Sequence, residues 1–300
     1  MDFKDRFREH ILPDKIHMLN VSFIVDTLDE KFGGTAGNIS HNCKLLGLDV
    51  NIVGAVGKDF GRYFDYLKKR GFDISHIKSF DDEYTSVATM ITDLDDNQIS
   101  AFYQGAMKHG HKVEIPKKFN AESFFVIAPS SQKEIICRVD EAKERNIPYL
   151  FDPGQQMTTL SGAELWKGAS GSTISIFNDY EWQLFREKTE KELDDLTSIK
   201  VTVIVTQGSQ GSVIYTKDGD TQVGVAKPSK VVDPTGAGDA YRAGIVFGYV
   251  NKLDWKVAGQ IAATMASYGV EEYGTQEHNP SIDEIKNRYK QNFDGVIPSH

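Results

Sequence analysis

Short apolar runs alternate with helical patterns along most of the 300 residues, and this alternation constrains the fold more than any other feature. The runs are rich in β-branched and aromatic residues, which is typical of strands buried on both faces. They occupy residues 50–56, 124–128, 149–151, 174–177 and 201–206. Helical spacing separates them, at residues 38–46, 62–69, 131–145 and 180–187. Buried strands joined through helices predict a three-layer α/β/α fold with a mostly parallel central sheet.

Two segments alternate apolar and polar residues instead, which is typical of strands with one face in water. Residues 84–92 and 98–103 flank a turn-forming stretch and predict a hairpin. Residues 15–28 alternate in the same way and could pair with it. We therefore expect 15–28 and 84–103 to contribute a small β lid to one domain spanning residues 1–300. A second hairpin, around Asp218-Gly219, is expected at an edge of the main sheet.

Composition excludes several classes of function. The 34 basic and 43 acidic residues give a formal charge of −9, without a basic block for a nucleic acid backbone. The longest apolar stretches, such as 243–250, are far shorter than the roughly 20 residues of a membrane helix. Cys43 and Cys137 are too few and too far apart for a disulfide framework, and they favour the reducing cytoplasm. We expect neither nucleic acid nor membrane as a partner.

The segment most suited to chemistry is DPTGAGD, from Asp233 to Asp239, which opens a long apolar helix. Its small residues let a ligand approach the backbone, and the helix N-terminus attracts an anion. Asp239, in the first helical turn, could take a proton from a hydroxyl group brought to a bound phosphate. The alternative is purely structural: the turn caps the helix, and Asp239 stabilises its positive end.

Four motifs in a fixed order resemble those of the ribokinase-like (PfkB) sugar and nucleoside kinases. They are FGGTAGN at 32–38, NDYE at 178–181, TQGSQG at 206–211 and DPTGAGD at 233–239. The segments SFIVDTL, AFYQGAM, DPGQQ and YGTQE make the chain more similar to the prokaryotic adenosine kinases than to ribokinase. The resemblance covers essentially the whole chain and implies a ribokinase-like fold.

For the reacting groups, the resemblance implies that Asp239 is the base on the acceptor hydroxyl. Gly236, Ala237 and Gly238 are then the anion hole for the transferring phosphoryl group. Asn178 and Glu181 are implied to organise Mg²⁺, chiefly through its waters, with oxygens of the type that this ion prefers. The nucleotide side of the site is implied to consist of Thr206, Gly208 and Gly211.

For the acceptor, the resemblance implies that Gly33 and Gly34 let the backbone approach the ribose. Asn38 would hydrogen-bond the ribose hydroxyls, although an ordinary helix N-cap is the alternative interpretation. Ser22 and Phe102 would face the base, with Phe102 stacking on the purine. An aromatic residue on an alternating strand is more often simple packing.

The function that these roles imply is transfer of the γ-phosphoryl group of MgATP to the 5′-hydroxyl of adenosine, giving AMP and ADP. A nucleoside or sugar kinase of broader specificity is the first alternative, and a nucleoside-binding pseudokinase is the second. ATP is the co-substrate and Mg²⁺ the cofactor. A K⁺ requirement is left open, with Asp233 in place to contribute. The oligomeric state is also open, with a homodimer as one expectation.

The second alternative rests on the start of the chain. Members of the resembled family begin with a buried strand ending in Gly-Ser-x-x-x-Asp, whose Asp binds the ribose hydroxyls. Met1 falls after that segment in register, so neither Asp2 nor Asp5 takes its role. We therefore expect this form to bind adenosine weakly and to turn over poorly.

Overall fold

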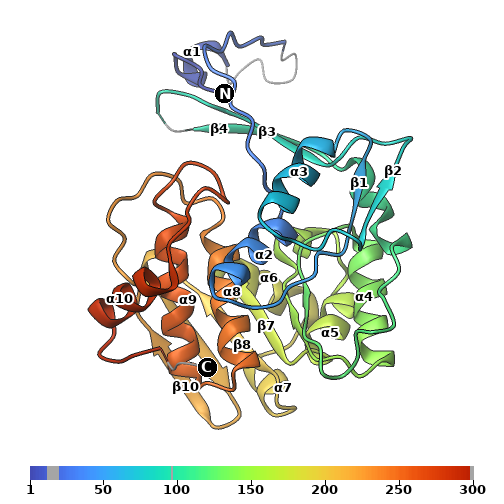
Figure 1. The fold of residues 1–300 in the computed structure, drawn as a ribbon, viewed down its shortest axis with the longest axis vertical. Helices are drawn as coiled ribbons and strands as arrows, with labels where there is room; N and C mark the ends of the chain where they lie inside the picture. Colours follow the sequence, from blue (N-terminus) through green and yellow to red (C-terminus); the bar gives the residue numbers. More distant parts are fainter. Residues whose placement is uncertain (12–19, 96, 298–300) are drawn as a thin grey trace.

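A six-stranded sheet in the order β10-β9-β8-β7-β6-β5 forms the middle layer of the computed structural model, which describes residues 1–11, 20–95 and 97–297 (Figure 1). Its parallel strands are β5 (Phe125–Ile127), β6 (Tyr149–Phe151), β7 (Ile174–Asn178) and β8 (Thr202–Thr206). The antiparallel edge strands are β9 (Ser212–Thr216) and β10 (Gly219–Val223). The mostly parallel sheet and its edge hairpin confirm the prediction from the sequence.

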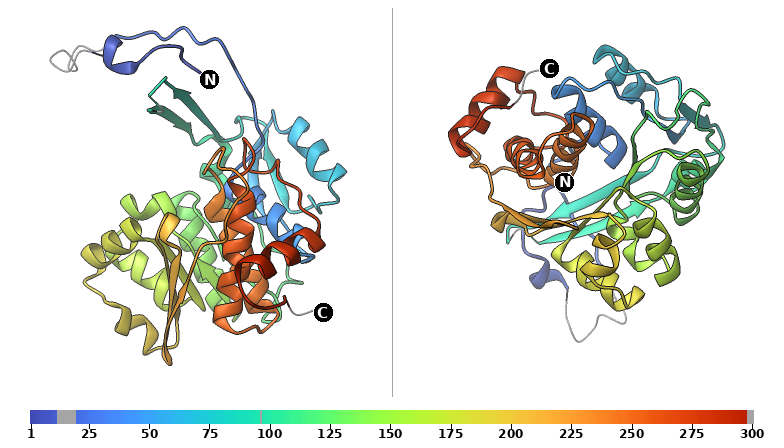
Figure 2. Two further views of the ribbon diagram at one scale, coloured as in Figure 1. Left: turned by 90° about the vertical axis from the view of Figure 1, so that its left-hand side faces the viewer. Right: turned by 90° about the horizontal axis from the view of Figure 1, so that it is seen from below.

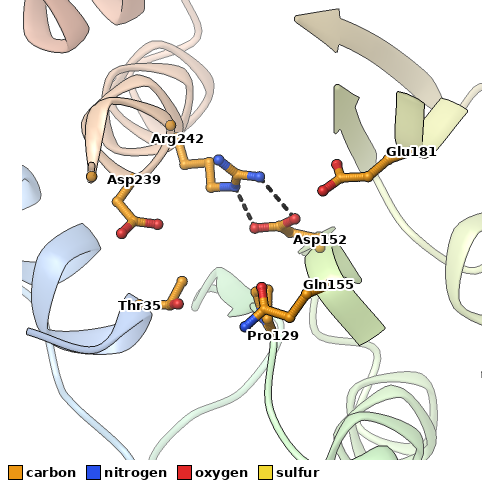
Figure 3. Close-up of a pocket in the computed structure, with 10 residues that line it drawn as sticks. Thr35, Pro129, Asp152, Gln155, Glu181, Asp239 and Arg242 are labelled. Atoms are coloured by element: carbon orange, nitrogen blue, oxygen red, sulfur yellow. Dashed lines mark hydrogen bonds and ion pairs between the residues drawn. The ribbon is translucent and has the colours of Figure 1, made fainter. Parts of the chain in front are cut away.

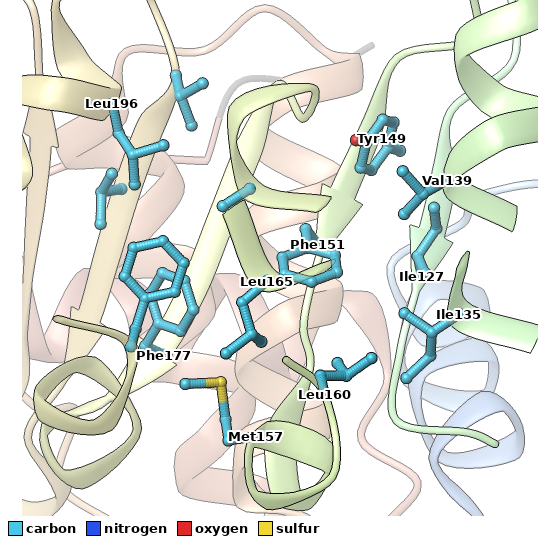
Figure 4. Close-up of a cluster of buried hydrophobic side chains, with 14 of the residues drawn as sticks. Ile127, Ile135, Val139, Tyr149, Phe151, Met157, Leu160, Leu165, Phe177 and Leu196 are labelled. Carbon is cyan, nitrogen blue, oxygen red and sulfur yellow. The ribbon is translucent and has the colours of Figure 1, made fainter. Parts of the chain in front are cut away.

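One face of this sheet is covered by four helices, drawn in green to yellow in Figure 1. They are α4 (Gln132–Glu144), α5 (Gly162–Ser170), α6 (Asp179–Thr189) and α7 (Leu193–Thr197). Phe151 and Phe177 point from the strands into this layer, where Leu165 of α5 packs with them (Figure 4). All three are fully buried, and each such side chain contributes about 1.5–3 kcal/mol through apolar burial.

The opposite face carries the helices that lead to the site. They are α2 (Thr35–Leu45), α8 (Ala237–Val250), α9 (Trp255–Gly269) and α10 (Ile282–Asn292). Ile174, Ile176 and Ile204 point to this side, because side chains along a strand alternate between faces. Gly244 and Gly248 leave no room for a Cβ against α9, so α8 and α9 pack very closely. This packing fixes where α8 begins.

The apolar run at 50–56 does not join the central sheet. It gives β1 (Gly54–Gly57), which pairs in parallel with β2 (Ile77–Phe80) as a separate two-stranded sheet. Phe60, Leu67 and Phe72 form a small core of their own under it, around α3 (Gly61–Lys69). The apolar side chains of this run are therefore buried in the small core around α3 and not in the main sheet.

The predicted hairpin at 84–103 forms from β3 (Val87–Thr92) and β4 (Gln98–Tyr103), which pair antiparallel. It projects from the body of the molecule together with the N-terminal segment (Figure 2). That segment contains α1 (Phe7–His10), and its Phe3 backbone N–H donates to the Thr92 carbonyl at 2.8 Å.

The described part of the expected lid strand 15–28, residues 20–28, forms no strand, and residues 15–19 lie outside the described residues. Residues 20–28 still alternate between more and less exposed side chains, and Phe23 packs on Phe3 and Phe7. The reason is competition for the strand edge, because Asp2 occupies a bridge position beside Thr92.

Among the residues that the structure describes, the remaining elements are the 3₁₀ segments η2 (Gly105–Lys112), η3 (Gly154–Thr158) and η4 (Gly208–Gln210). Within the described ranges, no helix combines the length and apolar character that a membrane crossing requires.

Candidate active site

Two glycine-rich turns that are about 200 residues apart in the sequence meet at Thr275. Gly236 is the N-cap of α8, with a φ of 85°, and a Cβ there would lie 2.8 Å from Cγ2 of Thr275. On the other side, a Cβ on Gly33 would lie 3.5 Å from Oγ1 of the same threonine. Gly34 then caps α2 with a φ of 88°, a conformation that glycine adopts without strain. The N-terminal and C-terminal motifs thus form one site.

Asp239 is held by a side chain from the other motif. Nδ2 of Asn38 donates a hydrogen bond to Oδ2 of Asp239 at 2.8 Å. Oδ1 of Asn38 accepts from Oγ1 of Thr275 at 2.8 Å and from Nε2 of Gln276 at 2.9 Å. Because two donors occupy the amide oxygen, the amide nitrogen of Asn38 has to face the carboxylate. The segment YGTQE therefore orients Asn38, and Asn38 orients Asp239.

The same network reaches the first glycine turn. Nε2 of Gln276 donates to the hydroxyl of Tyr63 at 2.5 Å, and that hydroxyl donates to the Gly33 carbonyl at 3.0 Å. Phe32 stacks on the Tyr63 ring with centroids 4.6 Å apart. The backbone of this turn and the Asp239 carboxylate are consequently fixed relative to each other.

The environment of Asp239 suits a base. Burial raises its pKa to about 6, while the Arg242 guanidinium and the Asn38 hydrogen bond act in the opposite direction. At neutral pH the carboxylate is mostly ionised, yet it holds a proton more readily than an exposed aspartate does. A pKa near the working pH is what general base catalysis requires.

Arg242 and Asp152 form an ion pair beside Asp239 that sequence reasoning did not single out. Nη2 of Arg242 donates to Oδ1 of Asp152 at 2.9 Å, and Nε pairs with Oδ2. Arg242 lies one helical turn after Asp239, so both side chains are on one face of α8. That spacing could have indicated Arg242, whereas Asp152 was seen only as the end of a strand.

These groups line a cavity of about 220 Å³ at the carboxyl ends of β5 and β6 (Figure 3). Its lining is almost entirely polar or glycine: Thr35, Pro129, Asp152, Gly154, Gln155, Glu181, Gly236, Gly238, Asp239 and Arg242. The cavity therefore collects residues from both halves of the chain around the N-terminus of α8.

Asn178 and Glu181 form a capping box at the start of α6. Oδ1 of Asn178 accepts from the Glu181 backbone at 2.7 Å, and Oε2 of Glu181 accepts from the Asn178 backbone at 2.8 Å. The only side-chain oxygen of Asn178 is thus engaged, while Glu181 also reaches the cavity. Burial raises the pKa of Glu181.

The expected nucleotide residues lie next to this box. Thr206 ends β8 and pairs in register with Asn178. Gly208 has a φ of 55° and Gly211 a φ of 94°, so both need glycine for the turn that follows the strand. The turn lies at the carboxyl end of the sheet, where open α/β sheets bind ligands.

Ser22 and Phe102 do not line the cavity. Ser22 is exposed on the segment before α2, and the Phe102 side chain on β4 is 54% exposed. Phe102 lies on the projecting hairpin, outside the hydrophobic core.

Comparison with known proteins gives consistent matches over most of the chain. The pfkB family of carbohydrate kinases matches residues 8–282. A nucleoside kinase of Methanocaldococcus jannaschii is 35% identical over 90% of this chain and 89% of its own length. A nucleoside kinase of Methanothermobacter thermautotrophicus is 34% identical over 90% of this chain and 88% of its own.

Comparison with solved structures also gives nucleoside kinases. The nucleoside kinase of Burkholderia thailandensis in complex with inosine is similar with a TM-score of 0.89 and 33% identity, over 99% of this chain and 95% of that one. Its complex with ADP and inosine has a TM-score of 0.84 at 34% identity, over 99% and 93% of the two chains. Fold, motifs and relatives lead to one conclusion: this chain belongs to the pfkB family of carbohydrate kinases and is an ATP-dependent phosphotransferase.

Proposed function

We propose that this kinase transfers the γ-phosphoryl group of MgATP to the 5′-hydroxyl of adenosine, giving AMP and ADP. The observation that carries the proposal is the Asp239 carboxylate, held by Asn38 at the N-terminus of α8 beside a polar cavity. This arrangement brings a base and a positive helix end to one point, as phosphoryl transfer to a hydroxyl requires.

In this mechanism Asp239 takes the proton of the acceptor hydroxyl as its oxygen forms the new bond to phosphorus. The bond between phosphorus and the bridging oxygen of ADP breaks, and ADP leaves with that electron pair. Backbone N–H groups of Gly236, Ala237 and Gly238 stabilise the charge on the transferring oxygens. Little covalent chemistry falls to the protein, whose work is positioning and charge stabilisation.

Glu181 is the better of the two proposed magnesium residues, because its carboxylate reaches the cavity while Asn178 acts as a helix cap. The ion would neutralise phosphate charge during transfer. The proposed ATP-binding residues are Thr206, Gly208 and Gly211. Oxygens of Asp233 already accept backbone bonds from Thr235 at 2.9 Å and Gly274 at 3.1 Å, so we propose a structural role for it beside any K⁺ site.

For the acceptor, we propose that Gly33 and Gly34 admit the ribose to the backbone, while Asn38 acts chiefly through Asp239. Ser22 and Phe102 would reach the base when the hairpin closes over the cavity. Closure would also exclude water and so prevent hydrolysis of ATP. The two reduced cysteines fit the reducing cytoplasm, which we propose as the location.

A kinase that accepts several nucleosides is the second candidate. It is supported by relatives named nucleoside kinases and by the inosine complex of one of them. Adenosine and inosine differ at the 6-substituent and in the proton on N1, so polar contacts at this edge of the base would discriminate between them.

The test is ADP release with adenosine, guanosine, inosine, ribose and fructose offered separately, with the phosphorylated position identified by ³¹P NMR. The proposal predicts the highest kcat/KM for adenosine and phosphorylation at the 5′ position. Comparable values for inosine or guanosine would favour the broader kinase. A preference for ribose or fructose would contradict the nucleoside assignment, and binding of nucleoside without ADP release would indicate a pseudokinase.

A further inference from the structure

The ion pair between Arg242 and Asp152 is buried, yet it faces the cavity and not the hydrophobic core. The side chains are only 14% and 1% exposed. Taking two such charges out of water costs several kcal/mol each, so a buried pair is weak evidence for a stabilising role. Figure 3 shows Arg242 pointing from α8 toward Asp152, with Asp239 to one side and Glu181 to the other.

Asp152 contacts only two of the three nitrogens of the Arg242 guanidinium group. Nε and Nη2 bind the two carboxylate oxygens, so the fork of Arg242 is fixed in direction. The remaining nitrogen, Nη1, lies against the backbone of Gly238, where a Cβ would be 2.6 Å away. One terminal nitrogen of a permanently charged group is therefore held beside the middle of the glycine turn.

Carboxylates outnumber cations among the residues that line the cavity. Asp152, Asp239 and Glu181 line it with Arg242 as the one basic side chain among the lining residues. Burial opposes the charge on Arg242, but these carboxylates outweigh it, with Asp152 the strongest, and hold the pKa of the guanidinium above its usual range. Arg242 consequently stays charged. Its guanidinium group is already oriented by Asp152 and does not have to move during the reaction.

We propose that Arg242 is a catalytic residue, whose Nη1 donates a hydrogen bond to the transferring phosphoryl group while Asp152 holds the guanidinium in place. The proposal rests on phosphoryl transfer at the α8 turn, as argued above. The phosphoryl oxygens carry spread charge in the transition state, and an arginine aimed at them contributes about 10³ to 10⁵ to kcat in other phosphotransferases. Asp152 is in this account a positioning residue.

The experiment compares Arg242→Ala with Arg288→Ala, a matched control. Arg288 forms a comparable ion pair with Glu271, with side chains 14% and 10% exposed, between α10 and the end of α9. We expect kcat to fall by about 10² or more in Arg242→Ala, with a much smaller change in KM for either substrate. Arg288→Ala should lose thermal stability but keep its kcat.

Rescue distinguishes a catalytic role from a structural one. Guanidinium ion at non-denaturing concentration should raise the kcat of Arg242→Ala at least about tenfold. It should not change the kcat of Arg288→Ala. Loss of kcat without any rescue, or turnover within about threefold of the wild type in the folded variant, would overturn the inference. Wild-type turnover in the same assay shows that the proposed function itself is intact.

Should Arg242→Ala fail to fold, the double variant Asp152→Asn, Arg242→Gln removes both charges of the pair together, so position 152 is not left with an unpaired buried carboxylate. The inference predicts that this protein folds and still turns over about 10² or more times slower. Near wild-type kcat in the double variant would mean that the pair is structural only.

Discussion

At the residue scale, the hydrogen bond from Asn38 lowers the proton affinity of Asp239, which burial raises. It stabilises the ionised carboxylate, whose pKa burial raises to about 6. In Asn38→Ala this pKa should rise further, so the acidic limb of the pH–rate profile moves to higher pH and kcat at pH 7 falls. Initial rates measured between about pH 5 and 8 check this.

Thr275→Val is the graded control for that variant. It removes one of the two donors to Oδ1 of Asn38 and leaves the bond to Asp239. We expect a shift in the same direction but smaller. A profile of Asn38→Ala that superimposes on the wild type would mean that Asn38 does not act through Asp239.

At the scale of elements, the hairpin of β3 and β4 offers Phe102 to a nucleoside base. Stacking on a base is worth roughly 1–3 kcal/mol, so Phe102→Ala should raise KM for adenosine about fivefold or more with little change in KM for ATP. Tyr103, 46% exposed, points to the opposite face of the hairpin and gives the matched variant Tyr103→Ala. Equal effects of the two variants, or equal effects on both substrates, would remove Phe102 from the acceptor site.

Helix α2 is fastened to the loop before α10 by two buried histidines. Nε2 of His41 donates to the His278 carbonyl at 2.8 Å, and Nδ1 accepts from Arg70 at 3.0 Å. Nε2 of His278 donates to Oδ1 of Asn42 at 2.8 Å. The bond from Arg70 needs a neutral His41 ring, because Nδ1 has to accept it. Burial lowers the pKa of each of the two histidines to about 4.

At these two histidines the unfolded chain therefore binds more protons than the native protein between about pH 6.5 and 4. The stability contributed by the pair is present above about pH 6.5 and is lost as the pH falls, by up to about 1.4 kcal/mol per pH unit for each histidine. The free energy of unfolding, measured with urea across this pH range, should fall less steeply with decreasing pH in His278→Gln than in the wild type. The glutamine amide keeps the bond to Asn42. The opposing effect of Asp239 is common to both proteins and cancels. Parallel curves would contradict the assignment.

At the scale of the whole molecule, the sequence predicted the layers well because periodicity reports burial directly. Strand runs such as 174–177 and 201–206 are mainly apolar, and the structure buries them on both faces of a covered sheet. The run at 50–56 has the same composition but pairs with β2, since composition does not say which core buries a strand. The expected strand at 15–28 is wrong for residues 20–28 for a similar reason, because the pairing edge has another occupant.

The site was predictable only where chemistry lies inside one motif. Asp239 and its glycines are adjacent in the sequence, so their roles could be proposed together. Asn38 was expected to bind ribose or cap a helix, but its bonds to Thr275 and Gln276 join positions more than 230 residues apart. No local pattern encodes such a contact. The pair of Arg242 with Asp152 escaped prediction for the same reason.

The most direct test of the whole account is the Asp239→Asn variant, assayed for turnover and for ATP binding in parallel. The amide keeps the size of the carboxylate but cannot accept the hydroxyl proton. We expect kcat to fall by about 10² to 10⁴, with an ATP dissociation constant by calorimetry close to that of the wild type. Turnover near the wild-type rate would contradict the claim that Asp239 is the base of this kinase.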